Sequence, residues 1–131
     1  MATDQAVRST MRYQITAAPA YMKAELFNRQ TARETGEFLS AVAAECIRRR
    51  RYRILISVRS SKPIFTVDKY GLSSFIELAV KFSGRIAVLA DSSEMRIAHE
   101  YAVTLARLRG VNARTFLAEA AAVEWLESEE S

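Results

Sequence analysis

The 131 residues are 50% hydrophobic and 26% charged, which is ordinary usage for one globular domain around a single core. The apolar runs are far shorter than the about 20 residues of a membrane-spanning helix, and the N-terminal "MATDQAVRSTMRYQ" lacks the apolar stretch of a signal peptide. We therefore expect a cytoplasmic protein, and the single cysteine, Cys46, fits a reducing compartment because it cannot form an internal disulfide.

The formal charge of +4 comes from one short segment. The run "RRRRYR", from Arg48 to Arg53, holds five of the 19 Lys and Arg residues, and the other 14 are outnumbered by 15 acidic residues. The basic excess is therefore local, and the rest of the chain does not provide the broad basic face of a nucleic-acid-binding domain.

The first expected elements form a hairpin. Residues 1–9 show no periodic apolar pattern and are predicted to be a disordered tail before one domain over residues 10–128, with 129–131 as an acidic end. From Met11, and again from Tyr21 to Phe27, apolar and polar residues alternate as they do in half-buried strands. The short connection through Pro19 predicts antiparallel pairing of the two strands.

A helix is expected next, ending near Arg50. Thr31 and Glu34 have the spacing of a capping box, in which a hydroxyl and a carboxylate satisfy free backbone amides at the helix start. Its apolar face, at spacings of three and four, is expected to comprise Phe38, Leu39, Val42, Ala43, Cys46 and Ile47.

Two strongly apolar segments follow, "RILISV" and "RIAVLA", and both are typical of strands that are buried on two faces. A loop from residue 59 to about 68 and a helix separate them. The apolar side of that helix is expected to comprise Tyr70, Leu72, Phe75, Ile76, Ala79 and Val80.

The last third of the chain predicts two helices around one strand. Asp91 and Glu94 have capping-box spacing at the start of a helix that ends at Gly110. "VNARTF" alternates like an edge strand, and a short final helix over about 118–127 should pack mainly through Val123, Trp125 and Leu126.

The order ββαβαβαβα predicts the α/β class: a mixed, mostly parallel sheet of four or five strands with four helices. The hairpin adds an antiparallel strand at one edge. We expect "ILISV" and "IAVLA" to lie side by side as parallel strands, so that the turns at Asp68 and Asp91 open on one rim of the sheet.

Two stretches of the sequence and the order of the elements resemble the STAS superfamily, and within it the SpoIIAA-like branch. The first stretch is "FTVDKYGLSSF", and the second is "RIAVLADSSEMRIAHEYA" with the following "VNARTFLAEAAAVEWL". Asp68, Gly71 and Leu72 match the Asp-Ser-Ser-Gly-Leu turn of anti-sigma-factor antagonists. The resemblance covers roughly residues 11–127, and it implies a STAS-like fold and a bacterial, cytoplasmic, regulatory setting.

In antagonists of this family the second Ser of that turn is phosphorylated. Tyr70 stands at the corresponding position here, and Lys69 stands at that of the first Ser. Tyr70 is a poor substitute for the serine because its long ring places the hydroxyl elsewhere.

Polar residues follow both buried strands at the expected rim, where open α/β sheets bind their ligands. The candidate binding residues are Asp68, Tyr70, Ser73, Ser74, Asp91, Ser92 and Ser93. Helix capping explains the Asp and Ser residues equally well without a ligand, so both interpretations stay open.

The sequence shows no combination of residues that predicts a catalytic or metal site. His99, the only histidine, lies mid-helix with no Cys, Asp or Glu at a helical metal-ligand spacing, so it is expected to be a helix-face histidine without a site. Cys46 lies on an apolar helix face, which favours an inert core thiol over a nucleophile. We therefore expect no enzymatic activity, no metal and no cofactor.

The arginine run has three interpretations, of which a solvated helix end is favoured. It comprises Arg48, Arg49, Arg50, Arg51 and Arg53. Contact with an anionic membrane surface or an acidic protein is the second interpretation. Nucleic-acid binding, with Tyr52 stacking on a base, is the least favoured.

The leading functional hypothesis is a non-enzymatic regulatory module that acts through protein–protein contacts. The alternative is a small carrier or sensor that holds an apolar or anionic ligand, such as a lipid, under the helix at Tyr70–Phe82. The edge strand Val111–Phe116 offers unpaired backbone groups for a homodimer.

Overall fold

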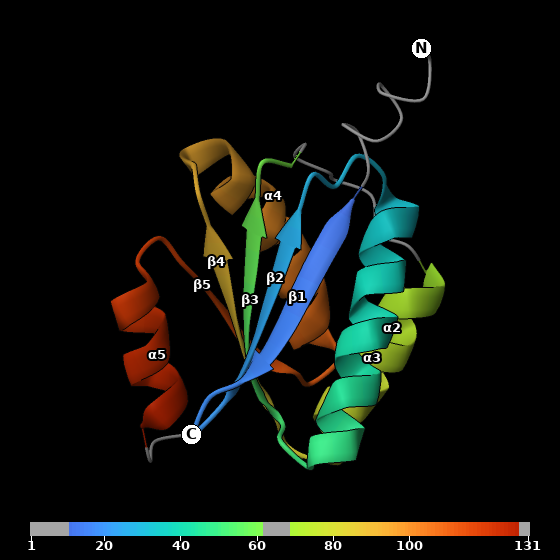
Figure 1. Ribbon diagram of the computed structural model, residues 1–131, viewed down its shortest axis with the longest axis vertical. Coiled ribbons are helices and arrows are strands. Elements are labelled where there is room, and N and C mark those ends of the chain that lie inside the picture. The colour runs from blue at the N-terminus through green and yellow to red at the C-terminus, as the bar shows by residue number, and fades with distance from the viewer. Residues whose placement is uncertain (1–10, 62–68, 129–131) are drawn as a thin grey trace.

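The computed structural model describes residues 11–61 and 69–128. Within these ranges five strands form one sheet in the order β1-β2-β3-β4-β5. The strands are β1 (Arg12–Ala17), β2 (Met22–Phe27), β3 (Arg53–Arg59), β4 (Arg85–Ala90) and β5 (Asn112–Phe116). β1 runs antiparallel to β2 and all other neighbours are parallel, so the predicted mixed sheet with an antiparallel edge strand is confirmed (Figure 1).

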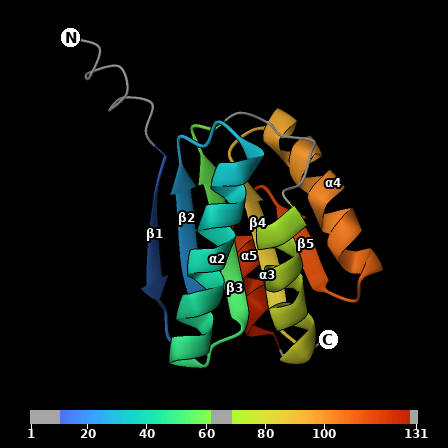
Figure 2. The same cartoon turned by 90° about the vertical axis from the view of Figure 1, so that its right-hand side faces the viewer.

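In the described part of the chain, four helices cover the two faces of this sheet. Three lie together on one face: α2 (Ala32–Arg49), α3 (Lys69–Lys81) and α4 (Ser93–Leu108) (Figure 2). Each of these helices connects two adjacent parallel strands, and the strand order advances across the sheet in one direction. Crossover connections of the same handedness therefore place all three helices on the same face. The fourth helix, α5 (Glu119–Glu127), lies alone on the opposite face (Figure 1).

The alternation of side chains along β2 shows how deeply each face of the sheet is buried. Met22, Ala24 and Leu26 are 0–1% exposed beneath the three-helix layer, whereas their neighbours Lys23 and Glu25 are only half-buried on the other face. That other face is covered by α5, which buries Leu55 and Ala87 with its own Ala122 and Leu126. The larger core therefore lies between the sheet and α2, α3 and α4.

The helix α5 is too short to be stable alone, since isolated helices below about 12–15 residues are marginal in water. It has no side-chain cap at its N-terminus. At its C-terminus, Arg53 and Arg85 donate hydrogen bonds to backbone carbonyls, with Trp125 and Ser128 accepting from Arg85 at 2.8 Å each. Two guanidinium groups from neighbouring strands thus hold the last turn against the sheet.

The predicted capping box at the start of α2 is confirmed. Thr31 Oγ1 accepts from the Glu34 amide at 3.2 Å, and Glu34 Oε1 accepts from the Thr31 amide at 3.1 Å. At the start of α4, the expected caps are Asp91, Ser92 and Ser93, and Ser92 is the one that caps the helix and accepts from the Met95 amide at 3.1 Å, so Asp91 and Glu94 do not form the predicted capping box. Asp91 instead accepts from the Ser60 amide.

Two expected core residues are exposed. Phe38, Val42 and Cys46 of α2 are 0–1% exposed, but Ile47 is 56% exposed. Val80 of α3 is likewise 46% exposed. Each follows a buried residue directly in sequence, and one helical residue turns the side chain by about 100°, out of the contact with the sheet. The side chains of Tyr70 and Leu72 lie outside the described residues.

The ends of β3 and β4 form a common rim, as expected from the pairing of "ILISV" with "IAVLA". Ile54 pairs with Ile86 and Val58 with Ala90 in a parallel register. Beyond the strands, the Ser60 amide donates to Asp91 Oδ2 at 3.3 Å and joins the two turns directly. Asp68, the other residue expected at this rim, lies outside the described residues.

Candidate functional site

An apolar cavity of about 120 Å³ lies between the sheet and the three-helix layer. Four strands form its floor through side chains that alternate toward the helices. These are Leu26, Ile56, Val58, Ile86, Val88 and Ala113. The cavity therefore lies inside the larger core. It lies beneath α3, which connects β3 to β4, and α4, which connects β4 to β5.

Small residues on the helices leave room for this cavity. Ala98, Ala102 and Ala106 recur every four residues on α4, so they share the face that turns toward the sheet. Gly36 of α2, which adds no side chain, also lines the cavity. Phe38 and Leu39 of α2 and Phe75 and Ile76 of α3 complete the apolar walls.

Arg29 brings a positive charge into the cavity wall. It lies in the connection between β2 and α2 and is only 5% exposed. Its amide donates to Ser61 Oγ at 3.0 Å, and its Nη1 donates to Thr35 Oγ1 at 3.4 Å. Burial lowers the pKa of the guanidinium, and the Glu34 carboxylate opposes this shift. Arginine stays protonated in proteins, so Arg29 is a cation at neutral pH.

His99 of α4 lines the same cavity and is 6% exposed. Among the described residues, neither ring nitrogen has a hydrogen-bond partner. Burial, followed by the positive charge of Arg29, lowers the pKa of His99 to about 4, while Asp91 raises it. The imidazole is therefore neutral at pH 7, with one nitrogen that donates and one that accepts.

This arrangement is suited to binding. Among the described residues that line the cavity, Arg29, His99 and Thr35 have polar side chains and the others are apolar. Cys46 is fully buried elsewhere in the core, where burial raises the pKa of its thiol to about 11 and leaves it protonated. Within residues 11–61 and 69–128, no group of His, Cys, Asp or Glu is placed to hold a metal ion.

Comparisons with known proteins identify the fold. No family model matches the sequence, and a search of the curated proteins also finds no match. Among solved structures, the chain is similar to the protein TM1081, with a TM-score of 0.57 and 12% identity over 90% of both chains. It is also similar to an uncharacterized DUF3478-family protein with a SpoIIAA-like fold from Shewanella loihica PV-4. That match has a TM-score of 0.52 and 13% identity, and covers 88% of this chain and 93% of the other.

This chain has a SpoIIAA-like fold. The identities are too low to carry more than the fold. The resemblance seen in the sequence is thereby confirmed at the level of architecture. None of the helices in the described part of the chain is long and apolar enough to cross a membrane.

In this SpoIIAA-like fold, none of the predicted rim residues whose side chains the structure describes lines the cavity. Asp91, Ser92 and Ser93 are exposed, and Asp91 and Ser92 have the turn-bridging and capping roles described above. Ser73 is half-buried and lines a separate surface depression with Arg109. Asp68 lies outside the described residues, as do the side chains of Tyr70 and Ser74, so the antagonist-like turn stays a prediction.

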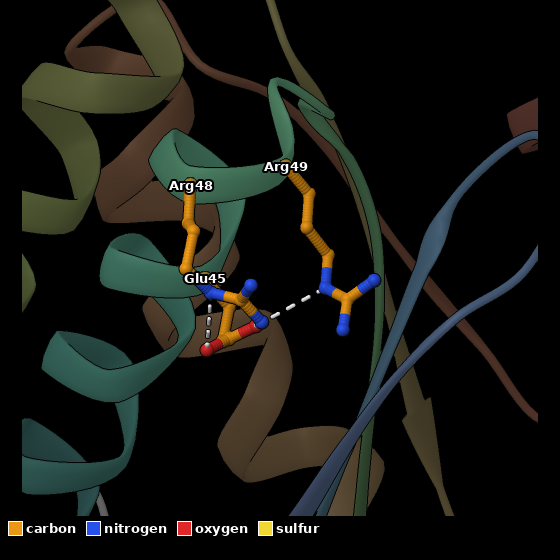
Figure 3. A network of polar contacts seen from close by, with 3 residues as sticks. All are labelled: Glu45, Arg48 and Arg49. Carbon is orange, nitrogen blue, oxygen red and sulfur yellow. Dashed lines mark hydrogen bonds and ion pairs between the residues drawn. The ribbon is translucent and has the colours of Figure 1, made fainter.

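The arginine run is largely engaged within the chain. Arg48 and Arg49 both bind Glu45 of α2, with nitrogen–oxygen distances of 2.6 and 3.2 Å (Figure 3). Arg51 donates to the carbonyls of Ala18 and Pro19, and Arg53 holds the end of α5. These contacts direct four of the five side chains to three different places: Glu45, the β1–β2 turn and the end of α5.

Sequence reasoning missed Arg29 and gave His99 no site. The signal for Arg29 is weak, because an arginine after a strand is ordinarily exposed. A stronger signal lies on α4, where Ala98, Ala102 and Ala106 mark a face with unusually little volume and His99 lies beside it. Only the packing of that face against the sheet shows that the missing volume becomes a cavity.

Proposed function

We propose that this chain is a non-enzymatic SpoIIAA-like module that binds a small, mainly apolar ligand between its sheet and the helices α2, α3 and α4. The cavity carries the proposal. Its volume is about 120 Å³, close to that of an engineered apolar cavity of about 150 Å³ that stays dry and binds benzene. Fully buried apolar residues rarely leave so much space unfilled.

The cavity volume limits the size of the ligand. Sites for drug-sized molecules measure about 300–1,000 Å³, so this cavity as it stands accepts one ring or a short chain. A lipid tail is longer than this volume accommodates. The proposal therefore narrows the apolar or lipid ligand expected from the sequence to a compact molecule.

The proposal is tested by filling the cavity. Ala98 is 2% exposed and lines it, so Ala98→Leu places a larger side chain in the ligand volume. We expect the amide resonances of cavity residues in the unsubstituted protein to shift on titration with toluene or benzyl alcohol, and those of Ala98→Leu to stay unchanged. Ala44→Leu, on the exposed side of α2, is the matched control and should bind normally. Equal binding by Ala98→Leu and Ala44→Leu, or no binding by the unsubstituted protein, would contradict the proposal.

A second function is supported by the outer side of α4. Ile97, Tyr101 and Leu108 are 59%, 45% and 79% exposed, and their spacings of four and seven place them along one side of the helix. An exposed apolar stripe of this kind fits contact with another protein. We propose regulation through such contacts as the second candidate, and ligand binding on the inner side of α4 is compatible with it.

A further inference from the structure

His99 is a buried polar side chain in the wall of the cavity. Among the described residues that line the cavity, Arg29, Thr35 and His99 are polar. Arg29 and Thr35 are joined by a hydrogen bond of 3.4 Å, from Nη1 to Oγ1. His99 is 6% exposed, and neither of its buried ring nitrogens has a hydrogen-bond partner among the described residues. A ligand can therefore form a hydrogen bond with His99 without displacing a described partner from it.

His99 lies near one end of the α4 face that lines the cavity. The helix begins at the rim where β3 and β4 end, and His99 is in its second turn. The lining continues along the same face through Ala102 and Val103 to Ala106, a helix length of about 10 Å from His99. These three residues are apolar. A ligand along this face therefore meets a polar group at His99 and apolar side chains farther on.

The neutral imidazole can both donate and accept a hydrogen bond. Burial lowers the pKa of His99 to about 4, so at pH 7 the ring has one N–H donor and one bare acceptor nitrogen. A buried donor or acceptor without a partner destabilises a fold, so nearly all such groups are paired. A hydroxyl suits either nitrogen, since it can donate to the bare one or accept from the N–H. A carbonyl or ether oxygen suits only the N–H, and a pure hydrocarbon suits neither.

We propose that the ligand of the cavity is a small apolar alcohol or phenol whose hydroxyl forms a hydrogen bond with a ring nitrogen of His99. This inference rests on the proposed ligand-binding function. A hydroxyl that leaves water for a wholly apolar site loses its hydrogen bonds, and this loss opposes binding. At His99 the hydroxyl regains a hydrogen bond and the imidazole gains a partner. The apolar part of the ligand then lies along α4 toward Ala106.

The test compares phenol with toluene, which differ only by a hydroxyl in place of a methyl group. Calorimetry at pH 7 should show phenol binding to the unsubstituted protein at least as tightly as toluene, although toluene is more apolar. His99→Leu should shift the ratio of the two affinities by about tenfold or more toward toluene, because the hydroxyl then has no partner on this residue. Thr104→Leu, at an exposed position of α4 outside the cavity lining, is the matched control and should keep the ratio within about twofold.

His99 provides a second readout in the unsubstituted protein. It is the only histidine, so its ring nitrogen resonances in an NMR spectrum are assigned without ambiguity. Phenol should shift at least one of them strongly, because that nitrogen enters a hydrogen bond, and toluene should shift both weakly. His99→Gln, whose amide both donates and accepts, should keep part of the phenol affinity that His99→Leu loses relative to toluene.

The outcomes separate this inference from the proposed function. If phenol binds more weakly than toluene, or if His99→Leu and Thr104→Leu show the same ratio of affinities, the hydroxyl ligand is excluded while the cavity remains a ligand site. If neither compound binds the unsubstituted protein, both proposals fail. If His99→Leu does not fold, the ring nitrogen shifts of the unsubstituted protein decide, and shifts of equal size with phenol and toluene contradict the inference.

Discussion

At the scale of single residues, burial keeps two titratable groups uncharged at neutral pH. Burial raises the pKa of the Cys46 thiol to about 11 and lowers that of the His99 imidazole to about 4. The directions are opposite because the charged form is the thiolate in one case and the imidazolium in the other. Cys46 is thereby an inert part of the core, and His99 is a neutral hydrogen-bonding group in the cavity wall.

The shifted pKa of His99 predicts a loss of stability in mild acid. The unfolded chain protonates this group near pH 6.5 and the folded chain only near pH 4, so its contribution is complete above pH 6.5 and is lost as the pH falls toward 4. A difference of this size corresponds to about 3 kcal/mol. Urea unfolding at pH 7 and pH 4 should therefore show the free energy of unfolding falling more for the unsubstituted protein than for His99→Leu.

Carboxylates also titrate in this pH range, and they do so in both proteins. The comparison with His99→Leu therefore removes their contribution to the change in the free energy of unfolding. Among the described residues, Arg29 lowers the pKa of His99 and Asp91 raises it. Equal losses of stability in the two proteins would mean that His99 is protonated in the folded state at much higher pH, and would remove the neutral imidazole from the cavity wall.

At the scale of elements, the two sides of α4 differ in character. Its inner side carries the alanines and His99 that shape the cavity, and its outer side carries the exposed Ile97, Tyr101 and Leu108. The start of the helix is fixed by the Ser92 cap, and its end by Gly110, whose φ of +92° suits a glycine that terminates a helix. The helix thus adjoins both the proposed ligand and the proposed protein partner.

The outer side of α4 can be changed without disturbing the inner side. The double substitution Ile97→Gln with Leu108→Gln should leave the free energy of unfolding within about 0.5 kcal/mol, as is usual for exposed positions, and leave cavity binding unchanged. It should reduce the capture of specific partner proteins from the native host, measured by quantitative mass spectrometry of pull-downs.

The matched control for this experiment is Leu117→Gln. Leu117 is 57% exposed and lies outside α4, just after β5. Partners that are captured equally by the double variant and by Leu117→Gln do not use the α4 stripe, and the second candidate function then loses its support.

At the scale of the whole molecule, the positive charge is concentrated at the end of α2. The segment Arg48–Arg53 accounts for the basic excess, but four of its five arginines bind partners within the chain, and Arg48 and Arg49 share Glu45. The hydrogen bond from Arg48 lowers the pKa of Glu45, and Arg51 fastens the β1–β2 turn through Pro19. Contact with anionic membranes or acidic proteins through this segment stays a prediction, as does a homodimer through the β5 edge.

The prediction for anionic surfaces can be tested without removing the structural arginines. The triple substitution Arg48→Gln, Arg49→Gln and Arg50→Gln spares Arg51 and Arg53, so folding should be preserved. If the segment binds anionic surfaces, retention on heparin or on phosphatidylserine vesicles should fall well below that of a control triple variant. The control changes Arg33, Arg96 and Arg109 to Gln and removes the same net charge from exposed positions elsewhere. Equal retention of the two variants would show that only net charge matters.

Much of the fold could be predicted from the sequence, because its signals are local. The alternation in β2, the Thr31–Glu34 capping box and the terminating Gly110 each act within one or two turns of chain, and all three are found in the structure. The wrong predictions concern residues at the edge of an apolar helix face. Ile47 and Val80 fit an apolar stripe by spacing alone, and only the contact between helix and sheet shows that both point outward.

The sequence by itself determined the order of the elements, the mixed sheet and the common rim of β3 and β4, since period, capping and connection length depend on neighbouring residues. The cavity and its polar pair were decided by the tertiary structure alone. Arg29 and His99 are 70 positions apart in the sequence, and each is ordinary in its own segment. Their burial beside one cavity depends on which face of α4 meets which strands, and on the volume that facing alanines and Gly36 leave empty.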